Sequence, residues 1–346
     1  MLIDKKSPHG GDIYTNAVRL DFSANINPAG MPEKVRQALI QAAESCSAYP
    51  DPYCTELRGK IAAHERVPMD AVLCGNGAAE LIYQYAYTLP KGKPALIVSP
   101  TFCEYEQALC AAGIPAEYYL LREADGFRLT EEILRTDFSK YSAVYLCSPN
   151  NPTGITVEPK LIDTIAATGV RLFCDFCFLD LTDHPEKYDI PSLIQTYPNL
   201  TILRAFTKSY TMAGVRLGYV LCGDAEFLAA MSEKTQCWNV STLAQAAGIA
   251  AMDCLDWLRD SVRLISEERK RITAELCALD IRVYPGEANY LLLYSGKNLT
   301  EPLMRRGMMV RDCSNYIGLG DGYIRIAVRT RSENDQLLTE LKEVLK

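Results

Sequence analysis

The chain has 346 residues, of which 48% are hydrophobic and 23% charged. This balance is typical of a globular protein, and the length predicts about two domains. The formal net charge of −7 at pH 7 argues against a nucleic-acid or anionic-membrane partner, and no apolar run is long enough to span a bilayer. We therefore expect an enzyme that acts on a small molecule.

Targeting signals and cysteine usage both indicate a reducing compartment. Residues 1–6 have no apolar stretch behind their lysines, which predicts neither a signal peptide nor an anchor and favours the cytoplasm. The thirteen cysteines are scattered through apolar stretches, where they are expected to pack as reduced thiols. Cys174 and Cys177 form an isolated C-x-x-C pair with no second pair at zinc spacing, so we predict packing there and no metal site.

In chain order, the first segment is irregular and the second is α/β. Residues 1–30 are rich in Gly, Pro, Asn and Asp, so we expect an N-terminal arm without helix or strand that packs on the last domain or on the functional site. Over residues 31–235, short apolar runs alternate with helical patterns, which predicts a large domain with a mainly parallel sheet. The predicted strands are 95–99, 143–148, 170–175, 201–206 and 217–222.

The last segment, residues 236–346, predicts a smaller α+β domain that begins with a connecting helix. The pattern is helical from about 241 to 279, which predicts one long connecting helix; the residues at alternating three- and four-residue steps are Leu255, Leu258, Val262, Ile265 and Arg269. Beyond it, four strands and a closing helix are expected at 281–284, 290–294, 308–311, 323–328 and 333–345.

A glycine turn could bind a phosphate. Gly75-Asn76-Gly77 lies between an apolar run that ends near Cys74 and a helical run over 81–89. Free N–H groups at the start of a helix attract anions, although such a turn also serves as a plain connector. No Gly-Lys-Ser/Thr follows, so this is not a Walker loop.

Two polar residues follow buried strands, whose carboxyl ends gather at one sheet edge. The prolines of Ser148-Pro149-Asn150-Asn151-Pro152-Thr153-Gly154 fix the backbone, and Asn151 could donate to a ring oxygen there, unless the segment is an ordinary turn. Asp175 ends the next strand. A buried carboxylate needs a cation, such as a protonated pyridine nitrogen; a helix N-cap or a surface turn is the alternative.

Lys208 and Arg216 complete the set of candidate residues. Lys208 ends the run Arg204-Ala205-Phe206-Thr207-Lys208, where a lysine can lose its proton and form an imine. Arg216, eight residues later, supplies fixed positive charge for a phosphate. A lone lysine is usually a solvated surface group, but the surrounding motif favours the functional interpretation.

Together, Asn151-Pro152-Thr153-Gly154, Asp175, Lys208 and Arg216 resemble the fold-type-I pyridoxal-5′-phosphate (PLP) aminotransferases of class I/II over nearly the whole chain. The resemblance implies a seven-stranded large domain and a homodimer. It also implies that Lys208 carries PLP as a Schiff base, that Asp175 pairs with the pyridine nitrogen, and that Asn151 bonds the ring's O3′. Further cofactor contacts would come from Ala78, Ala79, Phe102, Phe178, Thr207, Arg216 and, across the subunit interface, Tyr49.

Within this family, the two ends of the chain resemble the L-threonine-O-3-phosphate decarboxylases of cobalamin biosynthesis more than the histidinol-phosphate aminotransferases. By this likeness, Arg325 and Arg311 would bind the substrate carboxylate. His9, Asn25 or Asn27 would lie near the other end of the substrate. Ala79, Phe176, Phe178 and Ala205 depart from residues more usual in the family and leave the substrate open.

The reaction also stays open at the sequence level. The substrate bond at Cα that stands perpendicular to the conjugated ring breaks most easily, so either CO₂ loss or transamination can follow. In transamination, Lys208 would act as the acid and base. A non-catalytic PLP-fold sensor is a third reading, although such regulators carry a basic DNA-binding domain that this acidic chain lacks.

Overall fold

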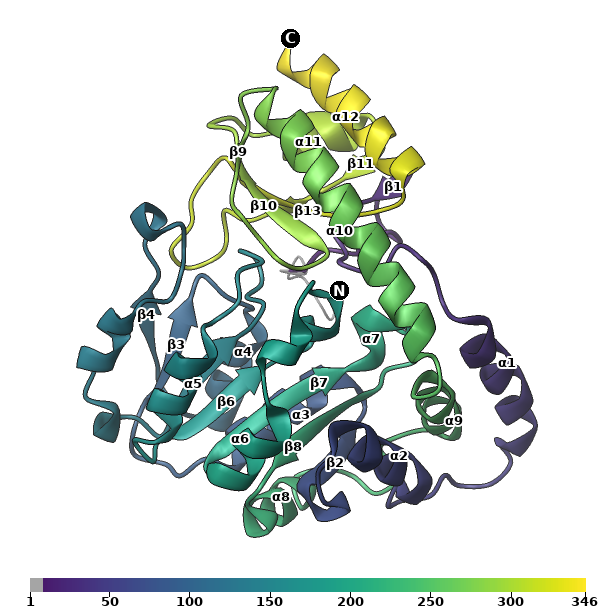
Figure 1. Cartoon of the computed structure of the whole chain (residues 1–346), viewed down its shortest axis with the longest axis vertical. Helices are drawn as coiled ribbons and strands as arrows, with labels where there is room; N and C mark the ends of the chain where they lie inside the picture. Colours follow the sequence, from purple (N-terminus) through teal and green to yellow (C-terminus); the bar gives the residue numbers. More distant parts are fainter. Residues whose placement is uncertain (1–8) are drawn as a thin grey trace.

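A seven-stranded sheet forms the centre of the computed structural model, which describes residues 9–346 (Figure 1). The strand order is β2-β8-β7-β6-β5-β3-β4, and every pair is parallel except the two that involve β8. The strands are β2 (Val72–Gly75), β3 (Ala95–Ser99), β4 (Ala116–Leu120), β5 (Ala143–Cys147), β6 (Arg171–Asp175), β7 (Leu200–Ala205) and β8 (Gly218–Cys222). The predicted α/β fold with a mainly parallel sheet is confirmed.

Burial explains which strands the sequence predicts. Every residue of β3, β5, β7 and β8 is buried, because helices cover both faces of the sheet and continuous apolar runs are needed there. All five predicted strands agree with the structure to within one residue at either end. The edge strand β4 was not predicted, because it is half exposed and carries no continuous apolar run.

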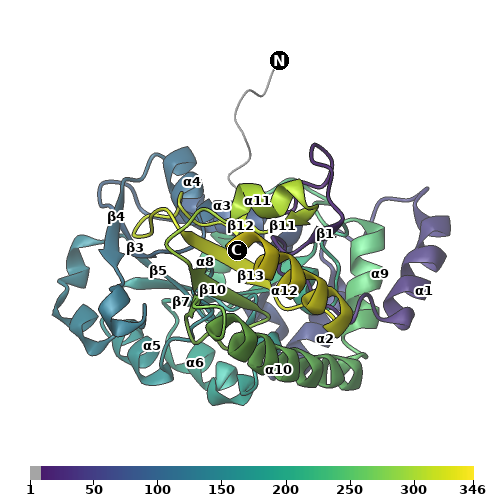
Figure 2. The same cartoon turned by 90° about the horizontal axis from the view of Figure 1, so that it is seen from above.

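Helices cover both faces of the large sheet, with α5 and α6 on one side and α3 and α4 on the other (Figures 1 and 2). The helices up to β8 are α1 (Glu33–Ala42), α2 (Thr55–Glu65), α3 (Gly77–Thr88), α4 (Glu104–Ala112), α5 (Pro159–Ala166), α6 (Ile190–Thr196) and the short α7 (Phe206–Ser209). Those after β8 are α8 (Ala225–Ser232), α9 (Thr242–Ala251), α10 (Leu255–Cys277), α11 (Thr300–Arg305) and α12 (Arg331–Leu345). Short 3₁₀ turns are η1 (Ala43–Ser45), η2 (Met69–Ala71), η3 (Glu123–Asp125), η4 (Glu131–Arg135), η5 (Phe138–Lys140), η6 (Leu179–Leu181) and η7 (Pro185–Lys187).

A second, antiparallel sheet of four strands carries the C-terminal part, in the order β12-β13-β10-β9. Its strands are β9 (Arg282–Val283), β10 (Tyr290–Tyr294), β12 (Arg311–Asp312) and β13 (Tyr323–Ala327). The predicted strand over 308–311 is divided, because β11 (Met308–Met309) pairs instead with β1 (Leu20–Asp21) of the N-terminal segment. The expectation that the N-terminal segment contains no strand is therefore wrong. The segment packs on the smaller sheet, as predicted.

The prediction of a single helix over 241–279 is wrong, because α9 and α10 are separate helices. α9 packs against α1 and α2, and Gly248 allows this approach: a Cβ there would lie 2.8 Å from Leu57 Cδ1. Between the helices, Asp253 forms ion pairs with Lys34 at 2.7 Å and Lys60 at 2.8 Å.

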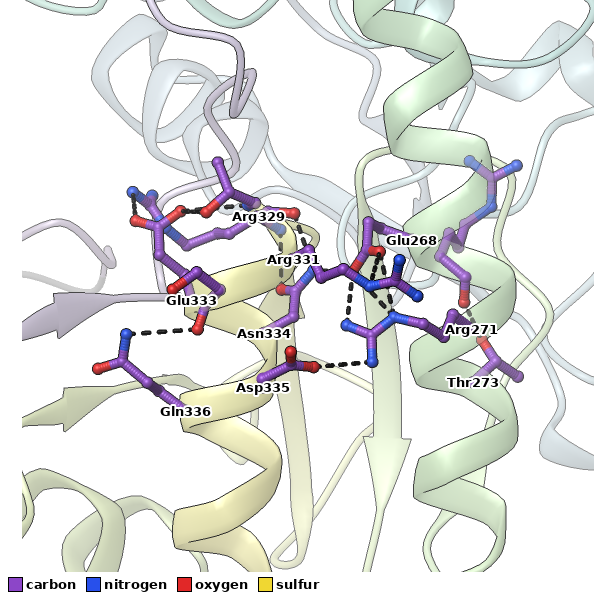
Figure 3. Close-up of polar contacts among 12 residues, drawn as sticks. Glu268, Arg271, Thr273, Arg329, Arg331, Glu333, Asn334, Asp335 and Gln336 are labelled. Carbon is purple, nitrogen blue, oxygen red and sulfur yellow. Dashed lines mark hydrogen bonds and ion pairs between the residues drawn. The ribbon is translucent and has the colours of Figure 1, made fainter.

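Polar contacts join α10 to α12 (Figure 3). The buried Glu268 accepts hydrogen bonds from Arg271 at 2.7 Å and from Asn334 at 2.9 Å. Arg271 also forms an ion pair with Asp335 at 2.8 Å. These contacts hold the two helices together beside the smaller sheet, whose strand β13 carries Arg325.

The domain division 1–30, 31–235 and 236–346 stays a prediction. Residues 1–8, on which the prediction of no signal peptide rests, lie outside the described residues. Over residues 9–346, none of the helices has both the length and the apolar character that crossing a bilayer requires. All thirteen cysteines lie in this range and are unpaired.

Candidate active site

A cavity of about 240 Å³ lies at the carboxyl ends of the parallel strands, where they meet the N-terminal segment and the smaller sheet. Every predicted site residue except Asn27 and Tyr49 lines it. These are His9, Asn25, Ala78, Ala79, Phe102, Asn151, Asp175, Phe178, Thr207, Lys208, Arg216, Arg311 and Arg325. The structure therefore brings together residues that are more than 300 positions apart in the chain.

Lys208 lies on α7, the short helix that directly follows the buried strand β7. Its Nζ is 6.0 Å from the centre of the Phe178 ring. Burial, followed by the positive charge of Arg325, lowers the pKa of Lys208 to about 8. A lysine with such a pKa carries a substantial neutral fraction near neutral pH and can act as a nucleophile.

Asp175 ends β6 and is only 5% exposed, so the alternative of a surface turn is excluded. The Tyr105 hydroxyl donates to its Oδ2 at 2.7 Å, and the Cys177 backbone N–H donates to its Oδ1 at 2.9 Å. Burial raises the pKa of Asp175, while these hydrogen bonds and the charge of Lys208 act in the opposite direction. Both hydrogen-bond donors are neutral, so the carboxylate can still pair with a cationic ring nitrogen in the cavity.

The phosphate-binding turn predicted at Gly75–Gly77 opens α3. Gly77 has a φ of +82°, and a Cβ there would lie 2.8 Å from Nη2 of Arg216. A residue with a side chain would thus displace the guanidinium from the helix N-terminus. Ala78, Ala79 and Thr207 line the same part of the cavity. Free helix N–H groups and an arginine together form an anion site.

The other end of the cavity is built around Arg325 of β13, which is 5% exposed. Its guanidinium donates to Oδ1 of Asn151 and, at 2.6 Å, to the carbonyl of Ser23. The Tyr316 hydroxyl lies 3.3 Å from the same Asn151 oxygen, which leaves the amide nitrogen of Asn151 to donate elsewhere. Two buried polar atoms, Nε of Arg325 and Oδ1 of Asn25, have no hydrogen-bond partner among residues 9–346.

Arg311 forms the wall beside this end. Its guanidinium carbon lies 5.0 Å from the centre of the Tyr316 ring, and Nη2 donates to Oδ1 of Asn315 at 2.9 Å. Sequence reasoning missed Tyr316, which lies in the loop between β12 and β13. It also missed Ser23 and Cys177, whose backbone groups make the contacts described above.

Asn27 and Tyr49 do not line the cavity. The Asn27 amide donates to the Ser209 carbonyl and to Oγ of Ser261, both at 2.9 Å, so it ties the N-terminal segment to α7 and α10. The expectation of a substrate contact at Asn27 is therefore corrected, and Asn25 is the asparagine that reaches the cavity. Tyr49 is 77% exposed and stacks on Trp238 at 4.2 Å. Its contact across a subunit interface stays a prediction.

Three of the departures noted in the sequence have defined surroundings. Phe178 meets Tyr290 edge to face at 4.9 Å, and Phe176 packs against Tyr188, also at 4.9 Å. Phe176 is 1% exposed and does not line the cavity. Ala205 does line the cavity and offers no hydroxyl to a phosphate there.

The family model "Aminotransferase class I and II" matches residues 18–341. The chain belongs to this family. It is 38% identical to threonine-phosphate decarboxylase of Salmonella typhimurium, over 98% of this chain and 97% of that protein. Histidinol-phosphate aminotransferase 1 of Archaeoglobus fulgidus is 33% identical, with 94% and 98% covered. The crystal structure of histidinol-phosphate aminotransferase from Clostridium acetobutylicum superposes with a TM-score of 0.89 at 27% identity, covering 94% and 99%.

As a member of aminotransferase class I and II, the chain is an enzyme that uses PLP. The cavity fits this cofactor on three independent observations. Gly77 leaves room for the Arg216 guanidinium at a helix N-terminus, as a phosphate requires. Asp175 is buried with only neutral hydrogen-bond donors, as a cationic ring nitrogen requires. Lys208 has the lowered pKa that imine formation requires.

Proposed function

We propose that this enzyme decarboxylates L-threonine O-3-phosphate. The observation that carries the proposal is the surplus of cations in the cavity. Lys208, Arg216, Arg311 and Arg325 line it, and Asp175 is the one carboxylate among the described lining residues. Arg216 faces the cofactor phosphate and Lys208 forms the imine, so Arg311 and Arg325 are left for the anionic groups of a substrate.

The charge pattern favours threonine phosphate over histidinol phosphate. Threonine phosphate carries a carboxylate and a phosphate, whereas histidinol phosphate carries only the phosphate. In the proposal, Arg325 and Arg311 hold the carboxylate through their planar forks. The other end of the substrate, its phosphate, would lie near His9 and Asn25. The 38% identity to a threonine-phosphate decarboxylase supports the same assignment.

PLP, held by Lys208, Asp175, Asn151 and the α3–Arg216 anion site, would supply an electron sink conjugated to the substrate amine. Arg325 orients the carboxylate that leaves, and the buried walls of the cavity exclude water. Lys208 holds the proton that replaces the carboxylate at Cα, because a pKa of about 8 lets it accept and return a proton near neutral pH.

A homodimer is part of the proposal, with Tyr49 of the partner subunit reaching the cofactor phosphate. Three aromatic side chains near this position are exposed: Tyr49 (77%), Tyr53 (72%) and Trp238 (43%). Tyr53 and Trp238 line a groove of about 520 Å³. Clustered exposed aromatic rings are typical of an interface. A reducing compartment such as the cytoplasm is proposed as well, because thirteen unpaired thiols would oxidise elsewhere.

The second candidate is a histidinol-phosphate-type aminotransferase, supported by the TM-score of 0.89 to such an enzyme. One assay separates the two. We expect the purified holoenzyme to release CO₂ from L-threonine O-3-phosphate without any keto acid. A requirement for a keto-acid acceptor, with amino transfer and no CO₂, would instead establish the aminotransferase. Ligand binding with neither reaction would indicate a sensor.

A further inference from the structure

A thiol, an imidazole and a carboxylate meet at the mouth of the cavity. Cys103 immediately precedes α4, Glu104 begins that helix, and His9 comes from the N-terminal segment. Nδ1 of His9 lies 3.8 Å from Sγ of Cys103, and Nε2 lies 2.7 Å from Oε1 of Glu104. The two ring nitrogens therefore face the sulfur and the carboxylate at the same time.

This order of groups activates a thiol. An imidazole next to a sulfur can take its proton, and a carboxylate on the far ring nitrogen stabilises the imidazolium that results. Hydrogen bonds with Cys103 and Glu104 raise the pKa of His9 to about 9, so the ring is protonated at neutral pH. The thiolate is the nucleophilic form of cysteine, and an imidazole beside the sulfur, here with Nδ1 at 3.8 Å from Sγ, is the arrangement found at reactive thiols.

The charged groups around Cys103 and His9 leave the contact between the sulfur and the imidazole in place. Cys103 shares a small cavity of about 40 Å³ with Glu106, Arg311, Tyr118 and Tyr316, so one acid and one cation face it besides the cluster itself. On the Glu104 side, Tyr83 of α3 also contacts the carboxylate, and burial and this contact raise the pKa of that phenol. Tyr83 therefore stays neutral and does not compete for the proton of His9.

We propose that Cys103 is a modification site for small electrophiles, and that an adduct on its sulfur obstructs the substrate cavity. In the step, Sγ forms a bond to the electrophilic carbon, the leaving group departs with its electron pair, and the proton of the thiol stays on His9. Phe102, Arg311 and Tyr316 line both the small cavity and the main one. A group attached at Sγ thus lies against the wall that the substrate contacts.

The twelve other cysteines provide internal references. Cys110 lies on α4, the helix that Cys103 precedes, and is exposed, whereas Cys103 is only half exposed. Accessibility alone would make Cys110 the faster thiol. We expect the opposite order, because among the described residues Cys103 is the cysteine grouped with a histidine and a carboxylate.

The test measures alkylation by iodoacetamide at pH 7 in the holoenzyme, with each cysteine followed by peptide mass spectrometry. A chelator is present, because the same three groups could coordinate zinc. We expect Cys103 to react about tenfold faster than Cys110. His9→Asn and Glu104→Gln should each slow Cys103 toward the rate of Cys110, with Cys110 itself unchanged. Equal rates in the wild type, or a Cys103 rate unchanged by both variants, would overturn the proposal.

A second measurement addresses the obstruction and separates misfolding from loss of reactivity. Protein alkylated at Cys103 should keep its melting temperature and cofactor absorbance but bind O-phospho-L-threonine at least about tenfold more weakly. Cys110→Ser should respond to alkylation as the wild type does. Unchanged binding after complete alkylation of Cys103 would refute the obstruction. The alkylation rates need no substrate, so they stand or fall independently of the proposed reaction.

Discussion

Two arginines, Arg204 on β7 and Arg325 on β13, are each only 5% exposed but differ in their partners. Arg204 forms ion pairs with Asp180 and, at 3.5 Å, with Glu65. Arg325 donates to two neutral oxygens, those of Asn151 and Ser23. The chain therefore neutralises one buried cation with its own carboxylates and leaves the other for a ligand.

The difference in partners indicates that Arg204 contributes to the stability of the fold, whereas Arg325 binds a ligand. A buried charge without a partner is unfavourable, so its presence in a folded chain indicates a ligand that supplies the opposite charge. Arg325, Arg311, Lys208 and Arg216 share one cavity with a single described carboxylate. Arg204 lies outside that lining, and its network continues to Tyr219, whose hydroxyl donates to Glu65.

The largest expected effect comes from removing the reactive cation of the cavity. Lys208→Ala should reduce turnover by about 10⁴-fold or more and abolish the absorbance of the lysine-bound cofactor. Steady-state rates and visible spectra measure both. The exposed Lys140 is the control, and Lys140→Ala should behave as the wild type. Residual turnover near the wild-type rate in Lys208→Ala would refute the assigned role.

The second-largest effect is expected from replacing Arg204, the arginine whose charge is neutralised by carboxylates of the chain. Arg204→Met should lower the free energy of unfolding by about 3–5 kcal/mol, because Asp180 and Glu65 keep their charges without a partner. Urea unfolding measures this loss. Arg171→Met, which breaks a half-exposed pair with Asp224, should cost about 1 kcal/mol or less. An equal loss in the free energy of unfolding in the two variants would show that the ion pairs of Arg204 are no stronger than a half-exposed pair.

The pH dependence of stability reports directly on the uncompensated lysine. The pKa of Lys208 is about 8 in the folded chain, against 10.5 for a free side chain. Between these values the unfolded chain binds more protons, so the free energy of unfolding rises with pH by on the order of 1 kcal/mol per unit. Denaturant unfolding of the cofactor-free protein from pH 8 to 10 tests this. The same slope in Lys208→Met would assign the effect to other groups.

The smallest effect concerns the hydrogen bond from Tyr105 to Asp175. Tyr105→Phe removes a donor that lowers the pKa of Asp175, so the acidic limb of the kcat/KM profile should move to higher pH by less than about one unit. Tyr85→Phe is the matched control, because its buried hydroxyl has no hydrogen-bond partner among the described residues. Identical profiles for both variants would exclude this role of Tyr105.

The sequence predicted the part of the site that follows buried strands. Asn151, Asp175 and Lys208 each come soon after an apolar run, and parallel strands bring such residues to one edge. Tyr316 and Ser23 were not predicted as site residues, because long-range packing alone brings their loops to the cavity. The strand β4 and the break between α9 and α10 were missed for the same reason, since local apolar periodicity carries no information on tertiary partners.

The comparison of the two arginines is tested most directly by Arg325→Met, with stability and activity measured on the same preparation. We predict that kcat/KM for L-threonine O-3-phosphate falls by about 100-fold or more. The free energy of unfolding of the cofactor-free protein should stay level or rise, because an uncompensated buried charge is removed. A loss of stability as large as that of Arg204→Met, with kcat/KM unchanged, would contradict the assignment of Arg325 to the substrate.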